Sequence, residues 1–227
     1  MAMALTAEQK RRKREKKLEK AGREVAEPIS RPRTERPLLG EFLGCCLRGF
    51  DGNGGLGNLV VVRTLTAGGA RVAGFLIDPD CLGVKDAFWS DRSASAARRS
   101  LAGLRADEEC LDISPSQARR ILEQAVDFAR GLGFEPEGDY TGSASILGDV
   151  ESTGEETVVR FPSREKPIYF ASPRDSSLKI RGVLETLLDS VGPEGFDYVI
   201  DASQAQAVQD VLARLQGGRS LVDSSAP

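Results

Sequence analysis

The chain of 227 residues is 40% hydrophobic, enough for one good-sized core, and no stretch approaches the roughly 18 consecutive apolar residues of a membrane span. It contains no histidine, which excludes Ser-His-Asp and Cys-His nucleophile systems and histidine-ligated metals, so any catalysis would rest on carboxylates, lysine, cysteine or tyrosine. The net charge of −3 conceals an asymmetry, because residues 1–37 hold twelve Lys and Arg against six Asp and Glu, whereas the other 190 residues hold nineteen against twenty-eight.

Residues 1–37 form a basic arm ahead of the expected domain. Thr6 and Gln9 have the spacing of a capping box, which begins a helix. The apolar residues that follow are too few to bury one face, so we expect a frayed, charge-rich helix. Pro28, Pro32 and Pro37, interleaved with arginine, then predict an extended linker.

The arm carries a dense basic cluster, formed by Lys10, Arg11, Arg12, Lys13, Arg14, Lys16, Lys17 and Lys20. Clusters of this density commonly bind nucleic acid or another polyanion, because cation–phosphate contacts release counterions. No aromatic side chain interleaves the cluster, so binding to RNA would be largely independent of sequence. The alternative is a solvated helix that only keeps the protein soluble.

Residues 38–216 are expected to form a single domain that begins with a three-stranded antiparallel meander. Its strands are predicted at 41–50, 59–65 and 71–77, with a glycine-rich loop over 51–57 and a hairpin over 66–69. Residues 78–90 are predicted as a loop or short helix. The stretch 93–105, rich in Ser, Ala and Arg, predicts a weak helix or a mobile segment.

The second half of the domain alternates helices with short strands. Ser114 and Gln117 make a capping box, with proline between them, for a helix that ends at Gly133. Further on, we predict strands at 167–171 and 196–200, a helix that starts after Asp175 or Ser176 and stops at 192, a last helix capped by Ser203, and a loose tail over 217–227. The fold class is therefore α/β (α+β), with helices packed on a mixed sheet, and the element order is compatible with a ribonuclease-H-like arrangement.

One sequence feature resembles a functional motif without the context that the motif needs, and the cysteines form no motif. Residues 52–57 match the dinucleotide-binding pattern G-x-G-x-x-G, but the residues that follow predict a strand instead of a helix, so we interpret them as a connector. The four cysteines, Cys45, Cys46, Cys81 and Cys110, form no C-x-x-C pair. We expect all four to be reduced, buried apolar side chains in a cytoplasmic protein, with no metal site and no cofactor.

Polar and charged residues gather at the end of the third predicted strand: Asp78, Asp80, Cys81, Lys85 and Asp86. Strand ends are common places for functional loops, and two carboxylates with a lysine could hold magnesium and polarise a phosphate. The structural alternative is a turn in which Asp78 caps backbone amides, Cys81 packs inward and Lys85 pairs with a nearby acid.

The segment 74–89, with the sequence GFLIDPDCLGVKDAFW, resembles the core of a bacterial protein family of unknown function whose pattern runs G-x-x-L-[IV]-D-x-x-C-L-G-V-K-D-x-F. The likeness continues through 128–134, 166–170, 173–175 and 191–198, and it covers most of residues 43–200. The chain departs from it at Glu137, where the family tends to have histidine, and at Glu165, where it tends to have glycine. The resemblance implies a domain of the same kind and transfers no mechanism.

Two functions remain from these observations. The first is a non-enzymatic cytoplasmic protein that binds RNA or a ribonucleoprotein, such as the ribosome, through its basic arm, with the body available to contact another protein and no association with a membrane. The second is a metal-dependent phosphoryl-transfer or nuclease-like enzyme with Asp51, Asp78 and Asp201 as its acids. We favour the first, because Asp51 lies in a glycine-rich loop and Asp201 immediately precedes a helix.

Overall fold

The computed structural model of the protein describes residues 39–50, 55–107, 109–154 and 157–214. The basic arm, the proline-containing linker and the tail over 217–227 lie outside the described residues, so their predicted structure stays a prediction.

The described chain begins with a five-stranded antiparallel sheet in the order β4-β3-β2-β1-β5. The strands are β1 (Leu39–Arg48), β2 (Gly57–Leu65), β3 (Ala70–Asp78), β4 (Gly83–Arg92) and β5 (Cys110–Ile113). Side chains that alternate along β1, β2 and β3 are buried on the two faces of this sheet. The predicted meander is thus confirmed, and it continues into a fourth strand.

The prediction of a loop or short helix over residues 78–90 is wrong for most of its length, because β4 occupies it. The register between β3 and β4 shifts between Leu76 and Ile77, which leaves Lys85 as the extra residue of a β-bulge. The bulge interrupts the alternation of apolar and polar residues by which a strand is recognised in a sequence. Strand β5 also escaped prediction, since only two of its four residues are partly buried.

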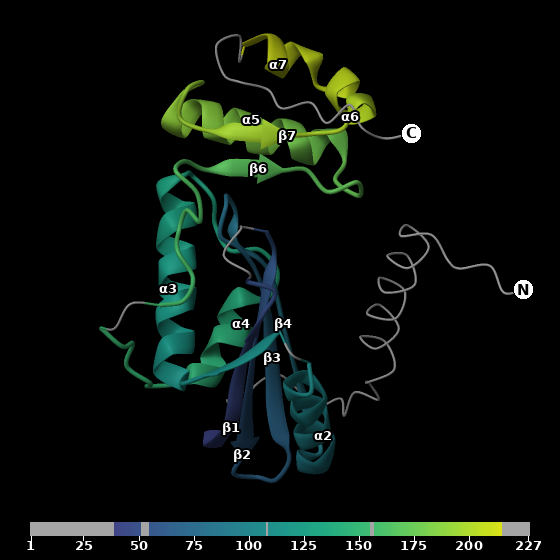
Figure 1. Ribbon diagram of the computed structural model, residues 1–227. Helices are drawn as coiled ribbons and strands as arrows, with labels where there is room; N and C mark the ends of the chain where they lie inside the picture. The colour runs from purple at the N-terminus through teal and green to yellow at the C-terminus, as the bar shows by residue number, and fades with distance from the viewer. Residues whose placement is uncertain (1–38, 51–54, 108, 155–156, 215–227) are drawn as a thin grey trace, which may run out of the picture. The chain divides into compact units, whose positions relative to one another are not determined.

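Helices cover both faces of the antiparallel sheet (Figure 1). Helices α3 (Pro115–Gly131) and α4 (Tyr140–Ala144), with the 3-10 turn η1 (Ser145–Leu147), pack on one face around Phe75 and Ile121. Helix α2 (Ala94–Arg105) packs on the other face, where Ala97 and Leu101 contact a smaller cluster with Val62 and Val72. Of the two alternatives for residues 93–105, a weak helix or a mobile segment, the structure has a helix.

A second core is built on a parallel pair of strands, β6 (Ile168–Phe170) and β7 (Asp197–Val199). It also contains α5 (Ser177–Val191), α6 (Ala202–Ala207) and α7 (Gln209–Arg214). Cys81 and Leu82, from the turn after β3, belong to this core. The turn therefore joins the antiparallel sheet to the parallel strand pair.

The α+β class is confirmed, but the parallel strands form a sheet of their own instead of extending the antiparallel one. Among the described strands, the single mixed sheet of a ribonuclease-H-like order is therefore not formed. The helix predicted from Ser114 is confirmed with its capping box, and the helix after Ser176 is confirmed with Ser176 as its N-cap. The last helix begins earlier than predicted, because Asp201, and not Ser203, caps α6.

Candidate functional site

The turn between β3 and β4 contains the first three residues of the candidate loop, and Asp78 shapes it. The Asp78 side chain is 5% exposed, and its Oδ1 accepts hydrogen bonds from the backbone N–H of Asp80 at 3.0 Å and of Cys81 at 3.1 Å. Burial raises the pKa of this carboxyl, while the nearby Lys85 ammonium and the two amides lower it. Asp78 thus caps the turn, as the structural alternative predicted.

Asp80 connects three segments that are distant in sequence. Its side chain is 1% exposed, its Oδ2 accepts the backbone N–H of Gly55 at 2.9 Å, and its Oδ1 accepts the Ser163 hydroxyl. Arg164 Nε lies 3.5 Å from the same Oδ1, and the Asp80 carbonyl accepts the N–H of Ile168 at 2.9 Å. The carboxylate therefore fixes the end of the glycine-rich loop and the segment that leads into β6.

The remaining three residues do not add a reactive group to the turn. Cys81 is buried in the second core, and both burial and the Asp78 carboxylate raise the pKa of its thiol, which keeps it protonated near neutral pH. Lys85 is half-buried at the bulge and acts on Asp78 through its charge. Asp86 is exposed on β4, where its Oδ1 lies against Gly138.

Gly83 shows how tightly the turn is packed against α3. Its φ is +62°, and a Cβ at this position would lie 2.2 Å from the Ala125 carbonyl oxygen and 2.7 Å from the Ala129 Cβ. Both the left-handed conformation and the close approach require glycine. Cys81, Leu82 and Gly83 of the segment 74–89 thus contribute to packing.

The acids of the enzymatic hypothesis have structural contacts where the structure describes them. Asp201 accepts the Ser203 hydroxyl at 2.7 Å and the N–H of Gln204 at 2.8 Å, and these bonds lower its pKa. Asp78 caps its own turn, and Asp51 lies outside the described residues. Within the described ranges, no three Cys, Asp or Glu side chains lie close enough together to hold a metal ion.

The arm's basic cluster, from Lys10 to Lys20, also lies outside the described residues. The structure therefore brings together Asp78, Asp80 and Cys81, with Lys85 close enough to act on them, and leaves the predicted polyanion-binding residues as a prediction. Sequence reasoning missed Gly55 and Ser163 as partners of Asp80. No local pattern could have found them, since Ser163 lies 83 residues further along the chain.

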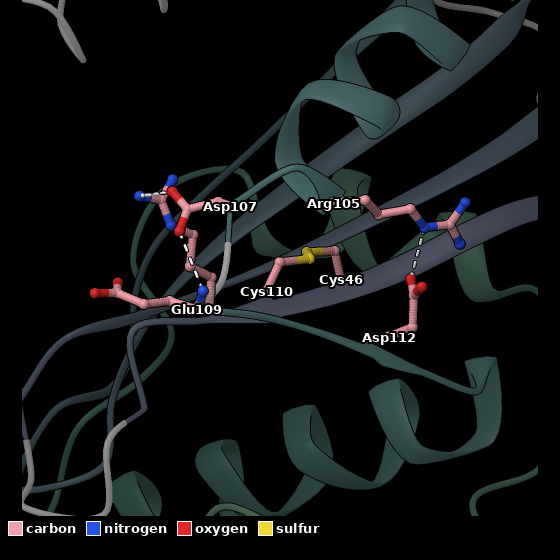
Figure 2. Close-up of a disulfide and its surroundings, with 7 residues drawn as sticks. Cys46, Arg105, Asp107, Glu109, Cys110 and Asp112 are labelled. Carbon is pink, nitrogen blue, oxygen red and sulfur yellow. Dashed lines mark hydrogen bonds and ion pairs between the residues drawn. A yellow bond between two sulfur atoms is a disulfide. The ribbon is translucent and has the colours of Figure 1, made fainter.

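A disulfide between Cys46 and Cys110 corrects the expectation that all four cysteines are reduced (Figure 2). The two residues lie diagonally on the same face of β1 and β5, with their Cα atoms 6.1 Å apart. This pairing could not be seen from residues 64 positions apart in sequence. The expectation of reduced, buried side chains is confirmed for Cys45 and Cys81.

Comparison with known proteins adds no relative from which to argue. No family model, no curated protein and no solved structure matches this chain. Of the helices in the described part of the chain, none is long and apolar enough to cross a membrane.

Proposed function

We propose that the protein is a non-enzymatic interaction protein whose basic arm binds RNA or a ribonucleoprotein, such as the ribosome. The observation that carries this proposal is the segregation of charge, with an excess of +6 in residues 1–37 and of −9 in the other 190 residues. Lys and Arg that contact phosphates release condensed counterions, and this electrostatic term dominates binding that is independent of sequence. Because the other 190 residues are acidic overall, we expect a polyanion to contact the arm.

The body's own cations support this assignment, because most of them already have partners. Nine of its Lys and Arg side chains form ion pairs with described acids: Arg48, Arg71, Arg105, Arg119, Arg130, Arg164, Lys166, Lys179 and Arg181. Another, Arg63, donates to the carbonyls of Gly40 and Ile146. A phosphate would have to compete with these contacts, whereas the arm has twice as many Lys and Arg as Asp and Glu.

The candidate loop favours a binding protein over the alternative of metal-dependent phosphoryl transfer. Asp78 and Asp80 are almost fully buried and already accept hydrogen bonds from the turn and from neighbouring segments. A carboxylate that holds a catalytic cation needs oxygen lone pairs directed at the ion and an open position for the substrate. These two side chains instead hold the fold together.

Fluorescence anisotropy with a labelled RNA hairpin tests the proposal on the full chain. If all eight cluster cations contact phosphates, the slope of log affinity against log salt is about −5.6 to −7.2, so a fourfold rise in salt lowers the affinity about 10³- to 10⁴-fold. Replacing the eight residues with glutamine, which keeps helix propensity, is expected to remove most of the slope.

A chain in which the order of residues 10–20 is shuffled is the matched control, since it keeps the charge and the composition. It is expected to bind as tightly as the natural chain, because contacts to phosphates do not depend on sequence. If the glutamine variant binds the RNA as tightly as the natural chain, the proposal is wrong.

A further inference from the structure

Helix α2 gathers exposed cations in one short segment of the body. Its twelve residues include three arginines and no acid. Arg98 and Arg99 are exposed, and no ion pair joins either of them to an acid in the described part of the chain. They therefore have no ion pair with a described acid to give up when they meet a ligand's charge.

A shallow depression runs along α2 where the helix meets β1. It is lined by Leu43 of β1 and by Arg98, Leu101, Ala102, Arg105 and Ala106 of the helix. Arg98 and Arg105 are seven residues apart, which places them on the same side of the helix about 10.5 Å apart along its axis. Two guanidinium groups thus flank a floor made of leucine and alanine.

Arg105 is oriented by a neighbour and keeps donors available. Its Nε donates to Asp112 Oδ1 at 2.7 Å, while its side chain stays 42% exposed. Figure 2 shows the contact between Nε and Asp112, with the terminal nitrogens directed beyond it. An oriented guanidinium that still offers two N–H groups can bind a phosphate in a bidentate way.

The support beneath the helix is rigid, which favours a preformed surface. Ala97 and Leu101 are fully or almost fully buried against the cluster that contains Cys46, and the Cys46–Cys110 disulfide lies in the same layer. The Ser93 hydroxyl caps the N-terminus of the helix by accepting the N–H of Ala96. The arginines therefore project from a fixed backbone, so binding orders their side chains without also having to order the helix.

Covalent connection brings the arm's ligand towards this helix. The arm and its linker lead directly into β1 at Leu39, and Leu43 on the same strand lines the depression. A polyanion held by the arm is kept at high effective concentration near β1, so a weak second contact adds to the first.

We propose that the α2 surface, defined by Arg98, Arg99, Arg105 and the depression beside Leu43, is a second contact for the phosphate backbone of the RNA that the arm binds. This inference rests on the proposed function and adds a site within the folded body. The lining contains no aromatic side chain, so the surface contacts phosphate and sugar without stacking on bases. The exposed Ala102 and Gly103 let a backbone approach the helix closely.

Anisotropy of the full chain with a labelled RNA hairpin tests the inference through the double variant Arg98→Gln/Arg99→Gln. Two lost phosphate contacts reduce the magnitude of the salt slope by about 1.4 to 1.8 and weaken binding about 15- to 30-fold at ~0.15 M salt. The matched control is Arg130→Gln/Arg174→Gln, which removes two exposed body cations far from α2 in sequence and is expected to change the affinity less than ~2-fold. A circular dichroism melt of both variants confirms that the fold is kept.

The outcomes separate this inference from the proposal on which it rests. If the RNA binds and depends on the arm, but the α2 variant has the affinity and slope of the natural chain, the α2 inference alone is overturned. If the natural chain does not bind the hairpin, both fail. If polyglutamate of equal charge displaces the RNA from the natural chain, and not from the α2 variant, the surface takes an acidic peptide instead of phosphate.

Discussion

Replacement of Asp80 with alanine is expected to destabilise the protein more than any other single change in the candidate loop. The carboxylate is 1% exposed and accepts hydrogen bonds from the Gly55 amide and the Ser163 hydroxyl. Alanine removes both bonds and leaves these donors without their acceptor. The end of the glycine-rich loop and the segment before β6 then lose their common anchor.

The magnitude follows from these contacts. A hydrogen bond to a charged group contributes about 1.5–3 kcal/mol, so the loss of two corresponds to about 3–6 kcal/mol. The ion pair with Arg164 adds little, about 0–1 kcal/mol, because the arginine side chain is 43% exposed and its charge is screened by water. The sum is a large part of the ~5–15 kcal/mol by which domains are typically stable.

Urea unfolding of the full chain, followed by circular dichroism, measures this loss. Asp86→Ala is the matched control, because it removes an exposed carboxylate from the neighbouring strand, and it is expected to change the free energy of unfolding by less than ~0.5 kcal/mol. Asp80→Asn keeps the size and one acceptor oxygen and is expected to lie between the two. If Asp80→Ala costs less than ~1 kcal/mol, the anchoring role is refuted.

Three other predictions concern stability. The Cys46–Cys110 disulfide closes a loop of 64 residues, so its reduction is expected to lower the free energy of unfolding by about 4 kcal/mol through the entropy of the unfolded chain. A urea midpoint that does not respond to reductant would contradict this. The control Cys45→Ala is expected to respond to reductant as the natural chain does. Burial raises the folded-state pKa of Asp78 above its ordinary 3.8, so folding favours the protonated carboxyl. Relative to Asp78→Asn, the natural chain is therefore expected to gain stability as the pH falls through the folded pKa towards 3.8, and a difference independent of pH over this range would show that burial does not perturb the group. Ser114→Ala removes the hydroxyl that accepts the N–H of Gln117 at the start of α3 and is expected to cost about 1 kcal/mol in the same unfolding assay.

Local chemistry made several elements predictable. The capping box at Ser114, the apolar spacing of α3 and the N-cap at Ser176 are written within a few neighbouring residues, and the structure has these helices where the pattern placed them. The strands of the meander were predictable because β-branched runs alternate with turns rich in glycine. Such signals need no knowledge of tertiary packing.

Other elements depend on contacts that a linear pattern does not contain. Strand β4 is a strand because it pairs with β3, and its bulge at Lys85 conceals the alternation. Strand β5 exists because it pairs with β1, next to the disulfide. The first residue of α6 was missed because Asp201 and Ser203 both have good capping neighbours, and the structure selects Asp201.

In the candidate site too, one residue's role could be predicted from the sequence and another's could not. The capping role of Asp78 was one of two readings available from the sequence, since an aspartate often binds the amides two or three residues ahead. The role of Asp80 was not available, because its partners at Gly55 and Ser163 come from distant segments. The sequence showed that residues 93–105 are rich in arginine. Only the structure showed that Arg98 and Arg99 form no ion pair with a described acid.

Covalent labelling of the lysine and arginine side chains of the full chain, with and without a structured RNA, tests most directly whether the arm is the polyanion contact. With mass spectrometry as the readout, we predict that the RNA protects the cations of residues 10–20 most strongly and those of α2 to a smaller extent, and that both protections diminish together as salt is raised. Protection confined to the body, with none in residues 10–20, would contradict the account.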